Sequence, residues 1–409
     1  MRILLYSISF SPEVAGSGRF NGEMANWLSQ RGHKVDVITA FPYYPEWNVR
    51  KEYKGKGWFI QKKPNLNVYR TPIYVPKVVT GKSRIIHELS FTINSFYHWC
   101  SLFLNKYNVV IAVCPPLQAG LLPLLFCKIT NTPFLFHIQD LQVDAARELG
   151  MIKNRWLLNI LDKVEQYILQ RADCVSSISE GMRSKIFQKG VDSSNYFMLQ
   201  NWVLTSSIKP LSKQDSLKKD MGFLESDKIA LYAGSIGEKQ GLEILIEVAD
   251  LLKSNTDIKI LVFGEGASKQ KLVEKAQLRK LKNLLFFPSW EEKQTAKLLS
   301  MADIHLVIQK QVASDLVMPS KLANILSVGG VSIVSAEKHT TLAKIVEDNA
   351  IGWSVIPENG DMLAQVIREK IMSPYLPLYS QNARAYAVEH LDKDSILSKF
   401  EEFLHLSFA

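Results

Sequence analysis

Lys321 stands where a helix normally disfavours a positive charge. Pro319 and Ser320 form a typical helix start, which places Lys321 in the first turn. A cation there opposes the helix dipole and costs on the order of a few tenths of a kcal/mol. This local cost is understandable if the ammonium group meets the diphosphate of a ligand. Lys321 is therefore the first candidate for a catalytic cation.

Two glycine-rich turns in the same half of the chain have the composition of phosphate-binding loops. The run Gly234-Ser235-Ile236-Gly237-Glu238-Lys239-Gln240-Gly241 leads from an expected strand into a helix. Its backbone amides and the cation of Lys239 are suited to a phosphate. Gly264-Glu265-Gly266 follows the next expected strand in a similar way, although alone it indicates only a turn.

A third glycine turn, Gly16-Ser17-Gly18, precedes the first expected helix. Its bare backbone lets a ligand approach the helix N-terminus, where amides and dipole favour an anion. Nicotinamide binding is one alternative, but that fingerprint puts its first glycine directly after the strand, whereas seven residues intervene here. Asp36 also lies inside the second expected strand rather than at its end. The other alternative is a purely structural turn.

Polar residues gather where the expected strand at 134–138 ends. His137 lies near the end of this strand. Gln139 and Asp140 directly follow the strand, and Asp144 comes shortly after them. Polar side chains at a strand end in an α/β sheet commonly face the ligand crevice. The alternative is that they are surface residues that cap the next helix.

The sequence favours neither a metal nor a disulfide. Its Asp-x-Asp run, Asp392-Lys393-Asp394, comes just ahead of the last expected helix, where a helix cap is the better interpretation. The four cysteines lie far apart in apolar surroundings without a Cys-x-x-Cys pair, so we expect buried, reduced thiols and a cytosolic protein. They are Cys100, Cys114, Cys127 and Cys174.

Positive charge is concentrated in the first half of the chain. The net charge is +9, and residues 1–200 hold 24 Lys and Arg against 14 acids. Within them, residues 50–84 carry ten basic residues and one acid, Glu52. Such a run attracts a polyanion, either nucleic acid or an anionic membrane surface. The alternative is a solvated loop that only improves solubility.

A helix expected directly after this basic run has apolar residues at helical spacing. Two interpretations are open: the helix packs on its own domain, or it helps to hold the protein at a membrane. No apolar stretch of the chain reaches the roughly 20 residues that a membrane-spanning helix needs. The apolar positions are Ile85, Leu89, Ile93, Phe96, Cys100 and Phe103.

Alternating strands and helices must position these residues, and they predict an α/β fold with two mostly parallel sheets. In the first half we expect strands at 3–8, 34–39, 68–74, 109–113, 134–138 and 174–178, and helices at 19–31, 85–105, 118–130 and 155–171. In the second half we expect strands at 229–233, 258–263, 284–287, 304–308 and 331–335, and helices at 241–253, 269–281, 292–301 and 320–328.

The length of 409 residues suits two domains. We expect a first domain at 1–203, a second at 204–392 and a last helix within 393–409 that crosses back to the first domain. Residues 203–214 have the composition of a linker. In open α/β sheets ligands bind at the carboxyl ends of the strands, so two such sheets facing each other would form one cleft for two substrates.

The chain resembles the retaining GT-B glycosyltransferases of family 4 over essentially its whole length, and more closely the bacterial colanic-acid-type fucosyltransferases. The resemblance rests on several motifs taken together. They are Ser11-Pro12-Glu13 with Gly16-x-Gly18 and Gly22-Glu23-Met24, Pro42-Tyr43-Tyr44-Pro45, His137-Ile-Gln-Asp140 with Val143-Asp144, Asn201-Trp202, the run 234–241, and Asp315-x3-Pro-Ser-Lys-Leu-x-Asn324.

Several positions depart from the family pattern. In the wider family, two acids separated by seven residues hold the donor sugar and its ribose; here the second falls at Asn324, and Leu316 takes the place of the first, with Asp315 beside it. Asn still bonds hydroxyl groups. The family's usual Arg after the first glycine is Ser235, and its usual Lys before the last glycine is Gln240.

The resemblance implies site residues in both domains. The crevice histidine of many relatives aligns best with Gln139, and His137 is close enough to compete. Catalytic roles are implied for Lys321, Lys239, Gln139 and Asp140, and acceptor-side contacts for Gly16, Ser17, Gly18 and His137. Donor contacts are implied for Gly234, Ser235, Lys239, Gln240, Gly264, Glu265, Asp315, Ser320, Lys321 and Asn324.

The implied function is a retaining, metal-independent glycosyltransferase without a cofactor. It would move a sugar from a nucleotide diphosphate, with GDP-fucose as the first guess, to a lipid-diphosphate-linked acceptor in bacterial capsular, exo- or O-polysaccharide synthesis. We expect a cytoplasmic enzyme, peripheral at the anionic inner face of the plasma membrane, with no nucleic-acid partner. The alternatives are a nicotinamide- or nucleotide-sugar-binding oxidoreductase or epimerase, and a non-catalytic module that binds polyanions.

Overall fold

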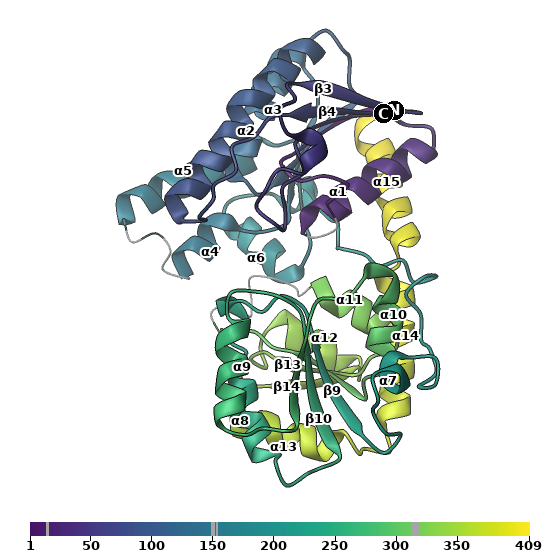
Figure 1. Ribbon diagram of the computed structural model, residues 1–409. Coiled ribbons are helices and arrows are strands. Elements are labelled where there is room, and N and C mark those ends of the chain that lie inside the picture. The colour runs from purple at the N-terminus through teal and green to yellow at the C-terminus, as the bar shows by residue number, and fades with distance from the viewer. Residues whose placement is uncertain (14–15, 149–151, 153, 312–319) are drawn as a thin grey trace. The chain divides into compact units, whose positions relative to one another are not determined.

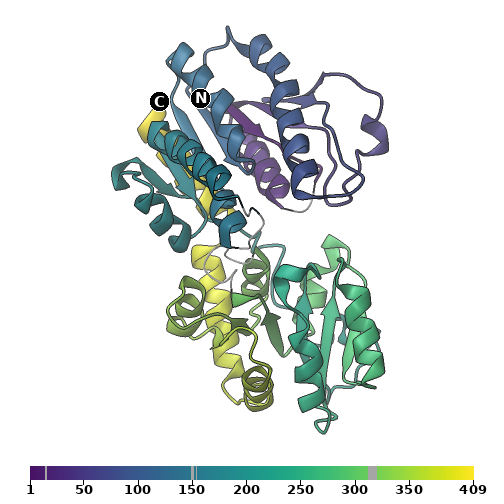
Figure 2. The ribbon, with the colours of Figure 1, turned by 90° about the vertical axis from the view of Figure 1, so that its left-hand side faces the viewer.

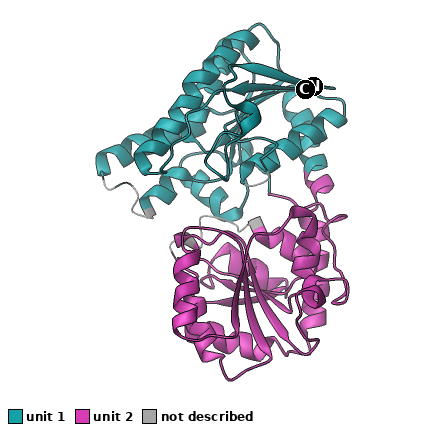
Figure 3. Ribbon diagram, viewed as in Figure 1, with its two compact units in different colours: residues 1–200, 397–409 teal, residues 201–396 magenta. Residues whose placement is uncertain are grey.

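Strands and helices alternate along both halves of the chain, as the sequence predicts. The computed structural model describes residues 1–13, 16–148, 152, 154–311 and 320–409, apart from the side chains of Glu148, Lys239 and Ser320. The chain forms two compact units, residues 1–200 with 397–409, and residues 201–396 (Figure 3). We call them unit 1 and unit 2.

Unit 1 is built on an eight-stranded sheet with the order β3-β4-β2-β1-β5-β6-β7-β8. All its neighbouring strands are parallel except β3 and β4, which pair antiparallel. The strands are β1 (Arg2–Ser7), β2 (Lys34–Ala40), β3 (Phe59–Lys63), β4 (Leu66–Thr71), β5 (Val109–Cys114), β6 (Phe134–Ile138), β7 (Cys174–Ser177) and β8 (Tyr196–Met198).

Helices cover both faces of this sheet (Figures 1 and 2). The core residues of β1, β5 and β6 on one face pack with α2, α3, α5 and α6, while α1 and α15 cover the other face. The helices are α1 (Ser17–Gln30), α2 (Gly81–Leu102), α3 (Leu121–Thr130), α4 (Gln142–Glu148), α5 (Arg155–Arg171), α6 (Glu180–Gln188) and α15 (Lys393–Phe408), with short 3-10 helices η1 (Lys51–Tyr53), η2 (Leu117–Gly120) and η3 (Ser193–Asn195).

Unit 2 has a six-stranded sheet, all parallel, with the order β11-β10-β9-β12-β13-β14. Its strands are β9 (Lys228–Ala233), β10 (Ile258–Phe263), β11 (Leu284–Phe287), β12 (Ile304–Val307), β13 (Ser332–Ser335) and β14 (Gly352–Val355). Its helices are α7 (Leu217–Asp220), α8 (Ile244–Leu251), α9 (Lys269–Leu278), α10 (Thr295–Ser300), α11 (Ser320–Ser327), α12 (Thr341–Asp348), α13 (Gly360–Lys370) and α14 (Leu376–His390), with η4 (Glu238–Gln240) and η5 (Glu292–Gln294).

The central strands are buried on both faces, which explains their continuous apolar sequences. All six residues of β5 are buried, as are five of the six in β9. Helices on both faces leave no solvent side for polar residues, so the strands do not alternate. The parallel arrangement predicted from the sequence is therefore confirmed.

Helix α15 begins at unit 2 and continues on unit 1. Asp392 caps its first turn, because one carboxylate oxygen accepts from the amides of Asp394 at 3.1 Å and Ser395 at 3.3 Å. Further along, Glu401 bonds Arg31 and the ring of His33, each at 2.8 Å. The interpretation of the Asp-x-Asp run as a helix cap is confirmed.

Three expectations need correction. The second sheet does not end with β13, because β14 pairs beside it after α12. Cys100 is exposed, whereas Cys114, Cys127 and Cys174 are buried as expected. Helix α2 does pack on its own domain, through Phe91 and Trp99, but the expected apolar stripe faces outward, because Ile93 is 70% exposed and Phe96 is 55% exposed. No helix in the described part of the chain is long and apolar enough to cross a membrane.

Candidate active site

The carboxyl ends of β9 and β10 continue into two glycine turns that bond to each other. The amide of Gly234 donates to the carbonyl of Phe263 at 2.9 Å, and the amide of Ile236 donates to Glu265, also at 2.9 Å. The amide of Ser268 closes the pair by donating to Ile236 at 3.1 Å. The two turns thus form one layer above the sheet edge, where ligands of α/β sheets bind.

This close pairing is the physical reason for Gly264 and Gly266. A Cβ atom on Gly264 would lie 1.9 Å from the carbonyl oxygen of Gly234, and one on Gly266 would lie 2.2 Å from that of Ile236. Both glycines also have positive φ, 145° and 157°. Any larger residue would push the two turns apart. Gly264 and Gly266 therefore shape the edge through backbone contacts.

Five of the amides in the run 234–241 already donate within the protein, two of them, those of Gln240 and Gly241, to carbonyls of the same turn. The amides of Gly234 and Ile236 donate to the neighbouring turn. The amide of Gly237 donates to Oε1 of Gln240 at 3.1 Å, so the Gln240 side chain closes η4. A phosphate at this edge must rely on other donors.

Lys321 supplies a cation at this place. Its Nζ lies 3.8 Å from the ring centroid of Tyr232 on β9 and 3.6 Å from where a Cβ of Gly234 would be. The Tyr232 hydroxyl donates to the carbonyl of Ser235 at 2.6 Å, which ties the ring to the glycine turn. The first turn of α11 therefore brings the ammonium against the first glycine turn, as a shared phosphate site requires.

The ammonium group of Lys321 has no carboxylate partner among the residues that the structure describes. It is half-buried, and burial lowers the pKa of Lys321 to about 7. The face of the Tyr232 ring attracts a cation, but only weakly compared with a full negative charge. An unpaired, partly desolvated cation beside a glycine turn is a natural anion site.

Some of the other residues predicted to contact the donor are described by the structure, and some are not. Asn324 is half-buried one turn further along α11, and Ser235 is exposed in the glycine turn. Glu265 is exposed and pairs with Lys269 at 2.8 Å. The sequence did not indicate Lys269, whose Nζ also donates to the carbonyls at the ends of β10 and β11. Asp315 and the side chains of Lys239 and Ser320 lie outside the described residues.

In unit 1 the predicted glycine turn packs on a buried carboxylate. Glu13 accepts from the amides of Tyr43 at 2.9 Å and Tyr44 at 3.0 Å, and its burial raises the pKa of the carboxyl group. A Cβ on Gly18 would come within 2.9 Å of this carboxylate. Gly18 therefore lets α1 approach the loop, and Glu13 joins the ends of β1 and β2.

Gly16 stands at the N-cap of α1 with φ of 63° and, as a glycine, has no side chain to cap the helix start. Ser17 follows as the first helical residue and is half-buried. The first turn of α1 contains no acidic residue. Its amides thus remain the positive end of a helix dipole at the carboxyl edge of the sheet.

Arg70 is a residue of this edge that the sequence reading placed only in the basic run. It is 2% exposed and donates to Gln61 at 2.7 Å, to the carbonyl of Ala40 at 3.2 Å and to that of Ser11. Burial lowers the pKa of Arg70 to about 10. Arg70 thus braces the loop after β1 and is not available to a membrane or polyanion.

His137 lies within the sheet. It is 2% exposed, and burial lowers the pKa of its ring to about 3, so the imidazole is neutral. Nδ1 is 2.8 Å from Oγ of Ser176, and Nε2 is 2.8 Å from Nε2 of Gln139. A proton on Nδ1 lets the ring donate to Ser176 and accept from the Gln139 amide. His137 thereby fixes Gln139, which is half-buried together with Asp140.

Other polar groups near this edge serve the structure of unit 1. Asp144 pairs with Lys189 at 2.6 Å and with Arg147 at 3.4 Å, and Lys189 also contacts the buried Glu165. Opposite charges satisfy each other in this cluster, which joins α4, α5 and the end of α6. Asp144 is consequently a structural residue of the motif.

One group of described residues has the composition of a metal site, but it lies at the other edge of the sheet. His33, Glu401 and His405 place ligand atoms within 4.8 Å of one another. His33 directly precedes β2, whereas the candidate site follows the carboxyl ends of the strands. Glu401 already bonds Arg31 and His33, so these contacts hold α15 on unit 1.

Comparison with family models gives the same division of the chain. Residues 15–202 match the model described as "Glycosyl transferase 4-like domain", and residues 213–387 match "Glycosyl transferases group 1". The putative colanic acid biosynthesis glycosyl transferase WcaI of Escherichia coli K12 is 38% identical over 407 residues, which cover 98% of each chain. N-acetyl-alpha-D-glucosaminyl L-malate synthase of Bacillus anthracis is 20% identical over 323 residues, covering 78% of this chain and 76% of that protein.

Solved structures agree on the fold. Sucrose-phosphate synthase from Thermosynechococcus elongatus superposes with a TM-score of 0.77 at 15% identity, over 100% of this chain and 99% of the other. The Anabaena protein HepE in complex with UDP gives a TM-score of 0.72 at 14% identity, over 99% and 100%. These likenesses establish the GT-B architecture of two Rossmann-like domains. The chain is accordingly a glycosyltransferase, and it belongs to the family that combines a glycosyl transferase 4-like domain with a group 1 domain.

Proposed function

We propose that this glycosyltransferase takes its sugar from a nucleoside diphosphate bound at the carboxyl edge of the unit 2 sheet. The observation that carries the proposal is the ammonium of Lys321 beside Gly234, which has no carboxylate partner among residues 1–13, 16–148, 152, 154–311 and 320–409. A diphosphate placed there would restore the charged form of the lysine, because an adjacent anion raises a pKa that burial has lowered. The Anabaena relative in fold was crystallised with UDP, which supports a nucleotide ligand for this architecture.

Lys321 then acts on the leaving group. When the bond between the anomeric carbon and the β-phosphate oxygen breaks, negative charge builds on that oxygen. A cation held in place before the reaction stabilises this charge more in the transition state than in the ground state. Lys239 remains the second candidate for this role. We propose that the step needs no metal ion, and that the anomeric configuration is retained as in the resembling family.

The acceptor is proposed to bind unit 1, at the carboxyl edge formed by the first turn of α1, Gln139 and Asp140. His137 and Glu13 support this edge from the interior through their hydrogen bonds. Because the E. coli relative is described as a putative colanic acid biosynthesis enzyme, we propose synthesis of a capsular, exo- or O-polysaccharide on a lipid-diphosphate carrier. GDP-fucose is the first donor to test.

We also propose that the enzyme works at the anionic cytoplasmic face of the membrane. Seven of the ten basic residues between Arg50 and Arg84 are exposed, two are half-buried and Arg70 is buried. Basic residues near an anionic surface contribute about 1 kcal/mol each. The exposed ones are therefore numerous enough to hold the protein at the membrane.

A donor screen tests the proposed function. GDP-, UDP-, dTDP- and ADP-sugars would be compared for their effect on thermal unfolding, with NAD and NADP as controls. We expect one nucleotide class to raise the melting temperature, since a ligand that binds only the folded state stabilises it. Transfer or slow hydrolysis of that donor should persist in EDTA. A shift with NAD alone would contradict the proposal, and complete loss in EDTA that magnesium or manganese restores would contradict the metal-free step.

A further inference from the structure

Helix α2 has two apolar sides, and only one of them is used by unit 1. On the inner side, Tyr6 of β1 stacks with Phe91 and Trp99 at ring-centroid distances of 5.0 and 5.1 Å, and its hydroxyl bonds Ser95. The outer side carries large apolar residues that remain 43–70% exposed. These are Ile85, Ile86, Leu89, Ile93, Phe96, Tyr97 and Phe103.

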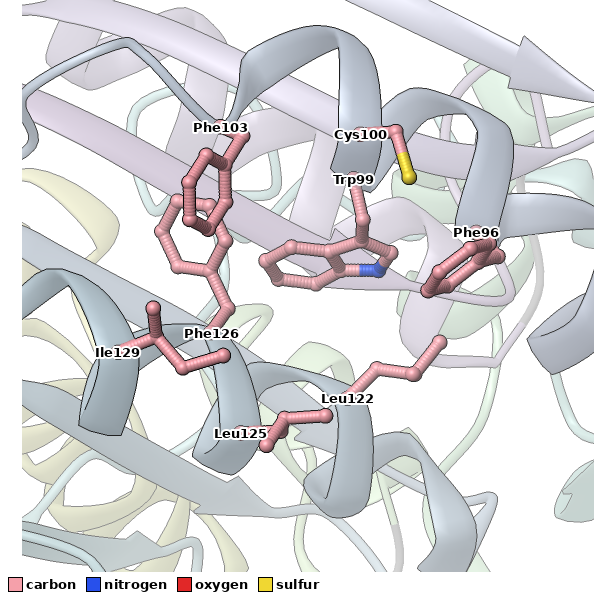
Figure 4. Close-up of a pocket in the computed structure, with 8 residues that line it drawn as sticks. All are labelled: Phe96, Trp99, Cys100, Phe103, Leu122, Leu125, Phe126 and Ile129. Atoms are coloured by element: carbon pink, nitrogen blue, oxygen red, sulfur yellow. The ribbon is translucent and has the colours of Figure 1, made fainter.

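A groove of about 400 Å³ lies between the second half of α2 and α3 (Figure 4). Trp99 and Phe126 are buried and form its floor, while Leu125 and Ile129 of α3 are more than half exposed at its rim. Its lining side chains are hydrocarbon except for the thiol of Cys100 and the indole nitrogen of Trp99. Such an apolar hollow does not hold water well. The full lining is Phe96, Trp99, Cys100, Phe103, Leu122, Leu125, Phe126 and Ile129.

The surface around the groove belongs to a segment almost free of negative charge. Between Tyr53 and Gln139 the single acid is Glu88, which is 7% exposed and pairs with Arg84 at 3.1 Å. The same segment has ten basic residues. Lys106, shortly after α2, and Lys128, next to the lining residue Ile129 on α3, are both exposed. This segment therefore presents an excess of positive charge to an anionic, apolar partner.

We propose that the outer side of α2 and α3 is the surface that enters the membrane, and that its groove holds one hydrocarbon chain of an anionic bilayer lipid. Exposed apolar area of this extent on a folded protein marks an interaction site. An interfacial helix of this kind buries its apolar side among the acyl chains and keeps its cations at the head groups. The apolar lining takes the chain, and the flanking lysines face the phosphates.

The charge favours a bilayer over a second copy of this chain as the occupant. Two copies meeting through this face would bring the same cations together, and like charges across an interface oppose association. A bilayer with anionic lipid supplies both missing parts, hydrocarbon and negative charge. The inference rests on the membrane partner proposed above but not on the transfer reaction.

Cys100 offers a direct probe because it lines the groove and is exposed, whereas Cys114, Cys127 and Cys174 are buried. A small fluorophore on Cys100 would be mixed with vesicles of phosphatidylcholine and 30% phosphatidylglycerol. Nitroxides deep in the lipid chains should quench it at least about threefold more than nitroxides on head groups. Cys100→Ser, which should take up no label, controls the site of attachment. Equal or absent quenching would overturn the inference.

Variants of matched chemistry test the surface without the label. Leu125→Glu places a carboxylate at the rim of the groove, and Leu278→Glu makes the same change at an 84% exposed position of unit 2. We expect Leu125→Glu to reduce partitioning into these vesicles at least tenfold and to keep it low at 0.5 M salt, with Leu278→Glu within twofold of the unchanged protein. Both positions are exposed, so both variants should fold, which circular dichroism would verify.

Three other results of these experiments would each decide a separate point. If Leu125→Glu binds vesicles like the unchanged protein, the groove face is not the docking surface. If Cys100 becomes protected without vesicles as the concentration rises, and the molar mass doubles, the face joins two copies and the inference is wrong. If chain quenching is found but no donor supports transfer, the docking surface stands while the proposed function fails.

Discussion

At the scale of single residues, the chemistry that we propose depends on Lys321, which pairs with no carboxylate in the part of the chain that the structure describes. Lys321 was singled out by its unfavourable place in a helix, and the structure adds the ring of Tyr232 beneath it and the glycine turn beside it. The helix dipole, the burial and the ring together hold a cation whose charge is easily lost. Such a group responds strongly to a bound anion.

Replacing Lys321 tests its catalytic role. Lys321→Ala should lower turnover by roughly 10²-fold or more, which is the usual effect of removing one group that stabilises the transition state. Steady-state rates with the donor found in the screen would measure it. Lys269→Ala serves as a control, because that lysine binds carbonyl groups at the same edge. Near-normal turnover of Lys321→Ala would move the role to Lys239.

The pH dependence of ligand binding provides a second measurement on Lys321. Because burial lowers its pKa to about 7, the unliganded protein loses this charge as the pH rises above 7, and a bound diphosphate must restore it. Nucleoside diphosphate affinity should therefore fall as the pH rises from 7, by up to about tenfold per pH unit. Calorimetry at pH 6.5–8.5 would measure this, and Lys321→Met should show a flat profile.

The same shift predicts an effect on stability. Between the folded pKa near 7 and the ordinary lysine value of 10.5, the unfolded chain binds the proton that the folded protein lacks. Burial of the charge therefore opposes folding fully below pH 7, and this penalty fades as the pH rises toward 10.5. Lys321→Met should be more stable than the unchanged protein at pH 6.5, and the difference in unfolding free energy should shrink by pH 10.

At the scale of elements, backbone contact between neighbouring turns matters as much as side-chain chemistry. Gly264→Ala puts a methyl group 1.9 Å from the Gly234 carbonyl oxygen, so the turns must separate. We expect the free energy of unfolding to fall by about 2–4 kcal/mol, and donor binding to weaken as well. Denaturant unfolding would measure the loss.

Gly222→Ala is the matched control for this prediction. Gly222 also has a positive φ, 78°, but no atom lies within 4 Å of the place where its Cβ would be. The Gly222→Ala variant therefore measures the backbone conformational cost of about 1 kcal/mol without a collision between the new methyl group and a neighbouring turn. Equal losses for the two variants would show that the contact between the turns is unimportant.

The elements themselves were largely predictable, because buried parallel strands have continuous apolar sequences. The helix at 155–171 and the strand at 134–138 were predicted with the bounds that the structure gives. β3 was missed since its sequence, Phe-Ile-Gln-Lys-Lys, belongs to an exposed antiparallel edge strand. β14 was missed because Gly352-Trp-Ser-Val has a short, weak apolar pattern.

The site was predictable in its parts but not in its contacts. Helix-start and glycine-turn chemistry are local, so Lys321 and the run 234–241 could be found in the sequence. The pairing of the two glycine turns, the Tyr232 contact and the burial of His137 depend on strand order, which no local pattern contains. Helix α2 illustrates the same limit. Both sides of the helix are apolar, and only the fold decides which side packs against the sheet.

At the scale of the whole molecule, the uneven distribution of charge between the two halves of the chain predicts binding to anionic membranes. Basic residues of the first half should draw it to anionic vesicles, and binding should weaken as salt screens the charges. Replacing Lys54, Lys56, Lys62 and Lys63 by Glu should lower co-sedimentation with such vesicles by about 100-fold or more.

The control for this experiment reverses the same number of exposed lysines in unit 2. Glu at Lys271, Lys275, Lys282 and Lys293 changes the net charge equally, yet should reduce binding far less. If both sets have the same effect, total charge rather than the basic run attracts the protein. If the unchanged protein ignores anionic vesicles at low salt, the lipid-linked acceptor loses its physical support.

The return of α15 to unit 1 has a consequence for the order in which the protein is made. Leu397, Phe400 and Leu404 are completely buried in unit 1, yet a ribosome must first synthesise residues 201–396. At about 5–20 residues per second this takes roughly 10–40 s. Throughout that interval the nascent first domain lacks the helix that binds Arg31 and His33, and at its end the second domain has its whole sequence. The domain translated first is therefore the one completed last.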